Sequence, residues 1–474
     1  MNKISGRNKN EQMIIEKFIN NNNSHIFYFW DELNDSEKDN LIEELKKVDI
    51  EAINIYYNNY KNKKIEDFTF EPTEYFSIED RIKYPEISDI GENALRKGEV
   101  AFLTVAGGQG SRLGFDAPKG CFPVSPIKKK SLFQIFAEKI KFYSCYYNYH
   151  FKWFIMTSED NNKDTVDFFS KNNYFGLIKE NVVFFTQNML PSVTLDNKLI
   201  LAEKSKLFRN PDGHGGILTA FFKSGLLKDI KKAGIRHISY FQVDNPLIDM
   251  ADPFFIGYHI YKNSEVTTKV IKKLYPEEKL GSIGKKNGRN AIIEYSDIPK
   301  ELMYAKNDDG SLKFLMGSIG VHVFDVDFLL NFTEKLPVHT AKKKTIAYDF
   351  YGDIPQKKEI DVLKFETFVF DTITLSKRSA FFETLRDEEF YPLKNKSGVD
   401  SIETCIKGQI SLHYDWLLKT QFVTQKDSDK IYEISPLFAP SRRIFIEKKD
   451  QSSDKIKEAI FNKDGTIKDE IYIE

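Results

Sequence analysis

Four short apolar runs constrain the fold of this chain more than any other feature. They lie at residues 100–106, 153–157, 182–185 and 238–243. Runs that are apolar at nearly every position are typical of strands buried on both faces, as in a parallel sheet. Helical patterns lie between them, one of them after Ser131. This alternation of strands and helices predicts an α/β fold with a doubly wound, mostly parallel sheet.

Three consecutive regions are predicted along the chain. Residues 1–97 have helical periodicity and are expected to form a helical N-terminal region. Residues 98–398 contain the four apolar runs and are expected to form the central domain. Residues 399–474 are expected to form a small C-terminal domain.

Local patterns add three further predictions. Ser131 and Gln134 have the spacing of a capping box at the start of a helix. Alternating stretches at 266–271 and 291–295 predict antiparallel strands that are inserted into the sheet or extend it. The run Lys128–Lys130 is expected to be a solvated face.

Composition and charge narrow the class of partner. Lys and Arg number 69 and Asp and Glu number 70, so the net charge is −1. No global field therefore favours nucleic acid or an anionic membrane. There is no apolar run of the ~20 residues that a spanning helix needs, no apolar segment typical of a signal peptide, and only three distant cysteines. These features predict a cytoplasmic protein with small-molecule partners, and they leave the oligomeric state open.

A glycine-rich loop follows the first apolar run. Its sequence is Ala106-Gly107-Gly108-Gln109-Gly110-Ser111-Arg112-Leu113-Gly114, followed shortly by Pro118-Lys119-Gly120. Glycines let successive backbone N–H groups approach a ligand and form an anion-binding nest. Arg112 and Lys119 add positive charge beside it. The loop is therefore predicted to hold several phosphates, and the alternative is a tight strand-to-helix turn with incidental charge.

Two familiar phosphate loops are excluded by spacing. A Walker loop requires Gly-x-x-x-x-Gly-Lys-[Ser/Thr], which does not occur in this sequence. A dinucleotide loop requires Gly-x-Gly-x-x-Gly, and Leu113 stands where the third glycine should be. A dinucleotide-dependent oxidoreductase is therefore disfavoured.

The loop resembles the signature of the eukaryotic-type UDP-sugar pyrophosphorylases, and most closely that of the UDP-N-acetylhexosamine branch. Further segments are similar to blocks of that family and occur in the same order. They are Gln187 with Met189-Leu190-Pro191, Pro211–Gly216, Val243–Leu247, Glu294–Asp297, Phe365–Asp371 and Glu389–Asn395.

The resemblance implies a Rossmann-like nucleotidyltransferase that makes UDP-N-acetylglucosamine and pyrophosphate from UTP and N-acetylglucosamine 1-phosphate. It implies catalytic roles for Arg112, Lys119 and Lys394. Nucleotide contacts are implied for Ala106, Gly107, Gly108, Gly110, Gln187, Gly213, His214 and Asp244. Sugar contacts are implied for Gly281, Glu294 and Ser318.

Two aspartates are candidate ligands for a metal ion. Asp244 lies at the predicted carboxyl end of a parallel strand, where open α/β sheets bind ligands. Asp371 follows the apolar stretch 368–370, which is expected to be a strand, and could complete the site. Carboxylate and phosphate oxygens suit Mg²⁺, with Mn²⁺ as the alternative. An aspartate at a strand end can equally cap a helix or stabilise a turn.

Two residues depart from the pattern of the N-acetylhexosamine branch. That branch usually has Asn at the positions of His214 and Ser318. Several UDP-glucose-type relatives have His at the position of His214. A UDP-glucose or broad-specificity enzyme therefore stays as the alternative. A non-catalytic UDP-sugar-binding paralogue is disfavoured because Arg112, Lys119, Asp244 and Lys394 are all intact.

Overall fold

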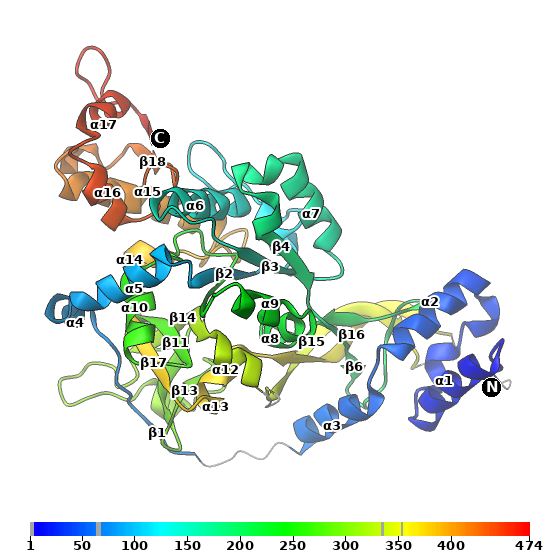
Figure 1. Cartoon of the computed structure of the whole chain (residues 1–474). Helices are drawn as coiled ribbons and strands as arrows, with labels where there is room; N and C mark the ends of the chain where they lie inside the picture. The colour runs from blue at the N-terminus through cyan, green and yellow to red at the C-terminus, as the bar shows by residue number, and fades with distance from the viewer. Residues whose placement is uncertain (1–3, 63–67, 333–335, 352–353) are drawn as a thin grey trace. The chain divides into compact units, whose positions relative to one another are not determined.

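The computed structural model describes residues 4–62, 68–332, 336–351 and 354–474 (Figure 1). The chain divides into two compact units, which are described separately. The smaller unit comprises Met1–Asp67, Gln187–Ile217 and Lys335–Val369. The larger comprises Phe68–Thr186, Leu218–Glu334 and Phe370–Glu474. Each unit is assembled from distant segments, so this division differs from the three consecutive regions expected from the sequence.

The larger unit is built on a ten-stranded sheet whose central strands are parallel. The strand order is β1-β12-β14-β10-β2-β3-β4, and β10, β2, β3 and β4 are parallel to one another. The predicted α/β class is confirmed, because each of the four apolar runs forms one of these strands. They are β2 (Val100–Val105), β3 (Trp153–Thr157), β4 (Val182–Thr186) and β10 (His237–Gln242).

Antiparallel strands extend the sheet beyond β10, as the alternating stretches predicted. β14 (Met316–Asp325) is antiparallel to β10 and also pairs with β11 and β12. The other strands of this part are β1 (Phe70–Glu71), β11 (Val266–Lys272), β12 (Gly281–Lys286), β13 (Arg289–Ile293) and β17 (Ser379–Glu383). Of these, β17 is parallel to its partner β11.

Helices of the larger unit connect and cover these strands. They are α4 (Ile78–Lys83), α5 (Glu86–Arg96), α6 (Leu132–Tyr146), α7 (Asn162–Lys171), α9 (Leu226–Lys232), α10 (Pro253–Tyr261), α11 (Lys300–Met303), α12 (Val326–Asn331), α13 (Asp371–Leu375) and α14 (Arg386–Glu389). Helix α8 (Gly216–Lys223) begins in the smaller unit and continues into the larger one.

Helices α5 and α10 lie side by side at very short range (Figure 1). A Cβ on Gly91 would lie 1.9 Å from the carbonyl oxygen of Pro253, and a Cβ on Gly257 would lie 1.9 Å from that of Ile87. Glycine is required at both positions because the two backbones are in contact.

The C-terminal residues pack onto the same hydrophobic core as α6 and the parallel strands. Trp416, Leu417, Phe445 and Ile471 are among their buried members. Their elements are α15 (Ile402–Lys419), β18 (Ile431–Ile434), α16 (Arg442–Lys448), α17 (Ser453–Ile460) and β19 (Glu470–Ile473), with β18 parallel to β19.

The smaller unit packs three helices against a long hairpin. Its aromatic cluster includes contacts between Phe27 and Trp30, with ring centres 5.9 Å apart, and between Phe29 and Tyr348, at 5.0 Å. Its elements are α1 (Lys9–Asn20), α2 (Asp35–Lys46), α3 (Ile50–Lys61), β5 (Met189–Pro191), β6 (Val193–Thr194), β7 (Leu201–Glu203), β8 (Lys206–Leu207), β9 (Arg209–Pro211), β15 (Val338–Asp349) and β16 (Gln356–Thr367).

Three local expectations are corrected. Ser131 caps α6 by accepting from the Gln134 N–H at 3.1 Å, but the Gln134 side chain donates to Glu138 instead of completing the box. Lys130 is buried rather than solvated, because its ammonium pairs with Glu138 at 2.6 Å. Residues 368–370 are not a strand, since β16 ends at Thr367 and a turn leads into α13.

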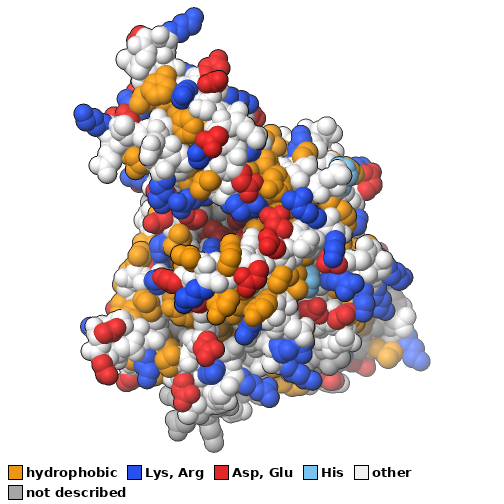
Figure 2. Space-filling model, turned by 60° about the vertical axis from the view of Figure 1, so that its left-hand side comes forward, with side chains coloured by type: hydrophobic (Ala, Val, Ile, Leu, Met, Phe, Trp, Pro, Cys, Tyr) orange, Lys and Arg blue, Asp and Glu red, His pale blue; other side chains and the backbone are white. Residues whose placement is uncertain are grey.

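The surface and the helices add two observations. Basic and acidic side chains are interspersed on the face of the molecule that Figure 2 shows. Among the described helices, none combines the length and the apolar character needed to cross a bilayer.

Buried histidines should make this fold sensitive to acid. Burial lowers the pKa of His237 and of His413 from 6.5 to about 4. Each therefore stays neutral in the folded chain at pH values where the unfolded chain binds a proton. Their contribution to stability is complete above pH 6.5 and is lost as the pH falls toward 4, by up to about 3 kcal/mol each.

Urea unfolding at pH 7, 5.5 and 4.5 would measure this loss. We expect His413→Gln to reduce the pH dependence of the free energy of unfolding, and His150→Gln, at an exposed position, to leave it unchanged. If the free energy of unfolding falls equally with pH in the parent protein and in both variants, other groups control the acid sensitivity.

Candidate active site

The parallel pairing of β2 with β10 brings the glycine-rich loop and Asp244 to one edge of the sheet. Val105 pairs with Gln242, and the Val243 N–H donates to the Val105 carbonyl oxygen at 3.1 Å. The chain leaves β2 at Ala106 and leaves β10 just before Asp244. This is the carboxyl edge of the parallel strands, where open α/β sheets bind ligands.

Internal backbone hydrogen bonds hold the loop in a compact shape. The Gly110 N–H donates to the Ala117 carbonyl at 2.9 Å, and the Lys119 N–H donates to the Gly108 carbonyl at 3.1 Å. Gly110 is needed for this closure, since a Cβ there would lie 2.9 Å from the carbonyl oxygen of Phe115. A Cβ on the exposed Gly108 would meet no atom within 4 Å. Packing therefore does not require glycine at Gly108, whereas close approach of a ligand would.

The two cations of the loop are not engaged with acidic groups. Arg112 is exposed in a short 3₁₀ turn (Ser111–Leu113), and Lys119 is half-buried at the start of another (Lys119–Cys121). In the described part of the chain neither forms an ion pair. Ala106 is buried and Gly107 half-buried at the beginning of the loop. Among the described residues, the loop thus presents two cations without an acidic partner.

A buried asparagine that sequence analysis missed anchors this loop. The Asn161 side-chain amide donates to the carbonyl of Ala106 at 2.9 Å and to that of Gly108 at 3.4 Å, and its oxygen accepts from the Ser158 N–H at 2.8 Å. Asn161 lies outside every recognised motif, so no sequence signal pointed to it.

A second asparagine joins Asp244 to the segment that carries Lys394. The Asn245 amide nitrogen donates to the Glu389 carbonyl at 2.6 Å, and its oxygen accepts from the Tyr391 N–H at 3.3 Å. The Asp244 carbonyl accepts from the Leu393 N–H at 2.7 Å. These bonds attach residues 389–393 to the end of β10, and they bring two predicted site residues together.

Lys394 and its neighbour Lys396 occupy different environments. The Lys394 ammonium lies 3.3 Å from the Asp400 carboxylate and 5.8 Å from the centre of the Phe390 ring. The ammonium of the exposed Lys396 lies 3.7 Å from the point where a Gly114 side chain would begin. Lys396 is thus beside the phosphate loop. Sequence analysis missed it, although it lies two residues beyond Lys394 and directly follows the block Glu389–Asn395.

The predicted sugar-binding residues meet across neighbouring strands. Gly281 at the start of β12 pairs with Ser318 of β14, and Glu294 directly follows β13, which pairs with β12. The Ser318 hydroxyl accepts from the Gly320 N–H at 3.3 Å. The register therefore gathers three residues that are distant in sequence.

A buried lysine lies beside this group. Lys273 donates to the hydroxyl of Ser282, the residue after Gly281, and burial lowers the pKa of its ammonium. In the sequence, the adjacent lysines 272 and 273 look like solvent-exposed residues, so sequence analysis missed Lys273.

The two candidate metal ligands lie in different local settings. Asp244 is half-buried at the sheet edge described above. Asp371 is the first residue of α13, which packs against β13, rather than the end of a strand. The described residues contain no group of three or more His, Cys, Asp or Glu side chains arranged to hold a metal ion. A cation at Asp244 would therefore take most of its ligands from substrate oxygens.

The remaining predicted residues lie in the smaller unit. Gln187 is buried directly after β4. Gly213 has a positive φ of 85°, and a Cβ there would lie 2.4 Å from the Thr367 carbonyl oxygen. The His214 ring nitrogen Nδ1 accepts from the Val369 N–H at 3.1 Å, and its ring stacks on Phe368 at 5.2 Å. His214 is therefore held rigidly by the segment after β16.

Comparisons with known proteins identify the family of the chain. Residues 50–419 match the family model described as UTP--glucose-1-phosphate uridylyltransferase. The UDP-N-acetylglucosamine pyrophosphorylase of Saccharomyces cerevisiae is 37% identical over 84% of this chain and 90% of its own length. The UDP-N-acetylglucosamine diphosphorylase 2 of Arabidopsis thaliana is 33% identical over 90% of this chain and 89% of its own.

A solved structure extends the likeness over nearly the whole chain. The crystal structure of the uridine diphosphate N-acetylglucosamine pyrophosphorylase from Trypanosoma brucei, in complex with an inhibitor, matches with a TM-score of 0.80. The two sequences are 25% identical, and the match covers 99% of each chain. The family match and the fold identify a nucleotidyltransferase. The chain belongs to the UTP–glucose-1-phosphate uridylyltransferase family.

The Asn245 contacts predict a measurable loss of stability. Asn245→Ala should lower the free energy of unfolding by about 2 kcal/mol, because it leaves the buried Glu389 carbonyl and Tyr391 N–H without their partner. Asn331→Ala, which removes an exposed amide bond to Asp327, is the matched control. Urea denaturation measures both, and equal losses would contradict the special role of Asn245.

Proposed function

We propose that the chain catalyses the reaction of UTP with N-acetylglucosamine 1-phosphate to give UDP-N-acetylglucosamine and pyrophosphate. One observation carries the proposal: a phosphate loop with two unneutralised cations lies at the same sheet edge as Asp244. The names of the yeast, plant and trypanosome relatives support the choice of this uridylyl transfer and of this sugar.

The chemistry requires positioning rather than a protein nucleophile. A phosphate oxygen of the sugar phosphate attacks the α-phosphorus of UTP in line, the new P–O bond forms, and pyrophosphate leaves with the electron pair of the broken bond. The attacking phosphate is largely ionised at neutral pH, because its second pKa is near 6. The protein must therefore bring two polyanions together and stabilise the charge that develops on pyrophosphate.

The residues of the site divide this task between them. The loop amides, Arg112 and Lys119 hold the β- and γ-phosphates. Lys394 offsets charge on the acceptor side. Gln187 reads the uracil edge, since its amide supplies both donors and an acceptor.

A divalent cation fits the carboxylate at the sheet edge. Asp244 supplies a hard oxygen ligand, and the substrates supply phosphate oxygens, which together suit Mg²⁺ or Mn²⁺. When bound, the cation would neutralise charge shared by the nucleotide and the sugar phosphate. Asp371 stays a proposed second ligand.

The setting proposed for this reaction is cytoplasmic. Its partners would be the two small-molecule substrates rather than nucleic acid or membrane.

Removing either cation of the loop should slow the reaction strongly. Arg112→Ala and Lys119→Ala should each lower kcat by about 10²–10³-fold, the effect typical of deleting one preorganised charge donor. Lys171→Ala, at an exposed position on α7, should stay within twofold of the parent protein. Pyrophosphate release measures the rate. Near-normal kcat in both loop variants would mean that the phosphates bind elsewhere.

Asp244→Asn should reduce activity and raise the Mg²⁺ concentration needed for half-maximal rate, since the amide removes an anionic ligand at little steric cost. Asp229→Asn, at an exposed position, should leave the Mg²⁺ dependence unchanged. Titrating Mg²⁺ against the rate of each protein tests this. Full activity of the parent protein in excess EDTA would refute the cation requirement.

The sugar preference depends on Ser318. Its hydroxyl already accepts from the Gly320 N–H, which leaves one O–H donor and one acceptor lone pair for the substrate. A site that has no side-chain amide dedicated to the N-acetyl group leaves fewer polar groups unpaired when a sugar without that group binds. Discrimination between N-acetylated and other sugars should therefore be modest. This keeps a UDP-glucose or broad-specificity enzyme as the second candidate.

N-acetylglucosamine 1-phosphate should be the best substrate, with glucose 1-phosphate or N-acetylgalactosamine 1-phosphate also converted. Ser318→Asn should sharpen the preference for the N-acetylated sugar. Measuring kcat/KM for each sugar phosphate in both proteins tests this expectation. A preference of the parent protein above about 10⁴ would refute a relaxed site, and a clear preference for glucose 1-phosphate would favour the second candidate.

A further inference from the structure

The loop that carries Asp244 has no regular secondary structure. Residues 243–252 lie between β10 and α10 and belong to neither element. Their backbone carbonyl groups therefore lack the partners that a helix or a sheet would supply, and side chains take that place. The Ser239 hydroxyl of β10, for example, donates to the Met250 carbonyl at 2.8 Å. The shape of this loop thus depends on side chains from neighbouring elements.

Lys139 of α6 makes two such contacts. Its ammonium donates to the carbonyl oxygens of Pro246 and Ile248, each at 2.8 Å. Lys139 is only 5% exposed, and among the described residues it forms no ion pair. A buried ammonium without an acidic partner is costly unless hydrogen bonds satisfy it. The two carbonyls meet this need, and the charge-assisted bonds fix the chain two and four residues beyond Asp244.

Helix α6 also supports the phosphate loop. A Cβ on Gly120, the residue after Lys119, would lie 2.2 Å from the ring of Phe133, so the turn that carries Lys119 packs directly on α6. Lys139 lies six residues farther along the same helix, a rise of about 9 Å. One helix therefore sets the separation between the phosphate loop and the loop that carries Asp244.

We propose that Lys139 is a positioning residue for the reaction, which holds the loop after Asp244 at the distance from the phosphate loop that the substrates require. It acts through the two carbonyls and not by contact with a substrate. This inference rests on the proposed function, because the distance matters for catalysis only if both loops bind the same substrates.

The surroundings of Lys139 make this role sensitive to pH. Burial lowers the pKa of its ammonium from 10.5 to about 8; the carboxylates of Asp249 and Glu389 oppose this shift, and the charge of Lys269 adds to it. His413 of α15 is neutral at these pH values, because burial lowers its pKa to about 4. Above pH 8 the amine of Lys139 is neutral, and its hydrogen bonds lose the charge that strengthens them.

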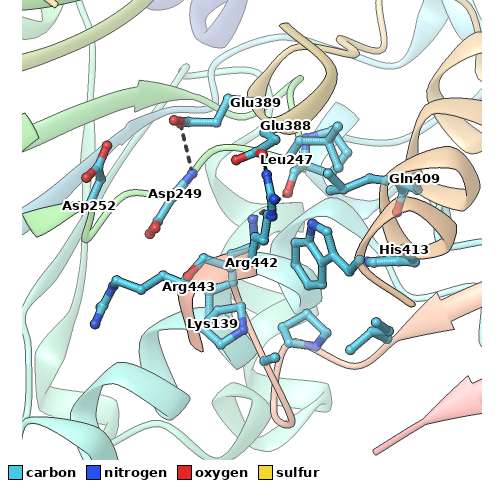
Figure 3. A pocket seen from close by; sticks show the side chains of 18 of the residues that line it. Lys139, Leu247, Asp249, Asp252, Glu388, Glu389, Gln409, His413, Arg442 and Arg443 are labelled. Carbon is cyan, nitrogen blue, oxygen red and sulfur yellow. Dashed lines mark hydrogen bonds and ion pairs between the residues drawn. The ribbon is translucent and has the colours of Figure 1, made fainter. Parts of the chain in front are cut away.

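The space beside Lys139 admits a larger cation. Lys139 lines a cavity of about 300 Å³, and Figure 3 shows it there with Asp249, Glu389 and His413. Arginine at this position therefore has room for its guanidinium, which stays charged throughout the accessible pH range. Methionine has a similar length but neither the charge nor the donors. The two substitutions separate the effect of the hydrogen bonds from that of packing.

Steady-state kinetics of the full chain tests the proposal. Lys139→Met should lower kcat at least tenfold and raise the Mg²⁺ concentration for half-maximal rate at least threefold, since small displacements of reacting groups are costly. Lys139→Arg should keep about half of the parent kcat or more. Lys141→Met, on the same helix but outside the cavity lining, should match the parent protein. Parent-like kcat and Mg²⁺ dependence in Lys139→Met would overturn the proposal.

The pH profile supplies a readout that a purely structural role would not change. Between pH 7 and 9 the kcat of the parent protein should fall about threefold or more, because Lys139 loses its proton while the substrate phosphates are already ionised. The kcat of Lys139→Arg should stay nearly constant over the same range. Identical profiles for these two proteins would overturn the proposal even if Lys139→Met fails to fold.

Hydrogen exchange separates this inference from the proposed function. The backbone amides of residues 247–251 should exchange at least fivefold faster in Lys139→Met than in the parent protein, whereas those of residues 153–157 in β3 should not change. Equal exchange at 247–251 would overturn the proposal. A parent protein that does not transfer uridylyl groups would refute the proposed function, and the exchange result would still decide whether Lys139 holds the loop.

Discussion

The parallel pairing of β2 with β10 is the constraint on which the candidate site depends. It brings the ends of two strands from distant parts of the chain to one edge, with Val105 opposite Gln242. Strands in such a sheet are buried on both faces, so polar groups within it need internal partners. Thr104 meets this need by accepting from the indole N–H of Trp153 at 2.7 Å.

A buried charge network then secures the segment that follows α14. Lys269 is fully buried and pairs with Asp252 at 3.0 Å and with Glu389 at 2.7 Å. Removing one member of such a network leaves an uncompensated charge, which typically costs about 3–5 kcal/mol. This network and Asn245 act on the same segment, so a loop distant in sequence is held beside Asp244.

The antiparallel extension of the sheet determines where the predicted sugar-binding residues meet. Gly281 is placed opposite Ser318 by the pairing of β12 with β14. A shift of one residue would turn the side chains of β12 to the other face, so the register matters as much as the residue types.

Much of this architecture could be predicted without coordinates, for physical reasons that are local. Continuous apolar runs identify strands buried on both faces, and they located β2, β3, β4 and β10 correctly. Glycines and cations clustered within fifteen residues predict a phosphate loop, because close backbone approach to a ligand requires that composition. Long-range contacts leave no comparable local signal. The anchoring amides of Asn161 and Asn245, the position of Lys396 beside Gly114 and the burial of Lys130 all depend on partners distant in the chain.

The turn at 368–370 was mistaken for a strand because an apolar triplet looks the same in either setting, and only the end of β16 at Thr367 distinguishes them. Residue types thus specify the elements and the chemistry, whereas the tertiary structure decides which of these groups meet, because hydrogen bonds and ion pairs between distant segments form only once the chain has folded.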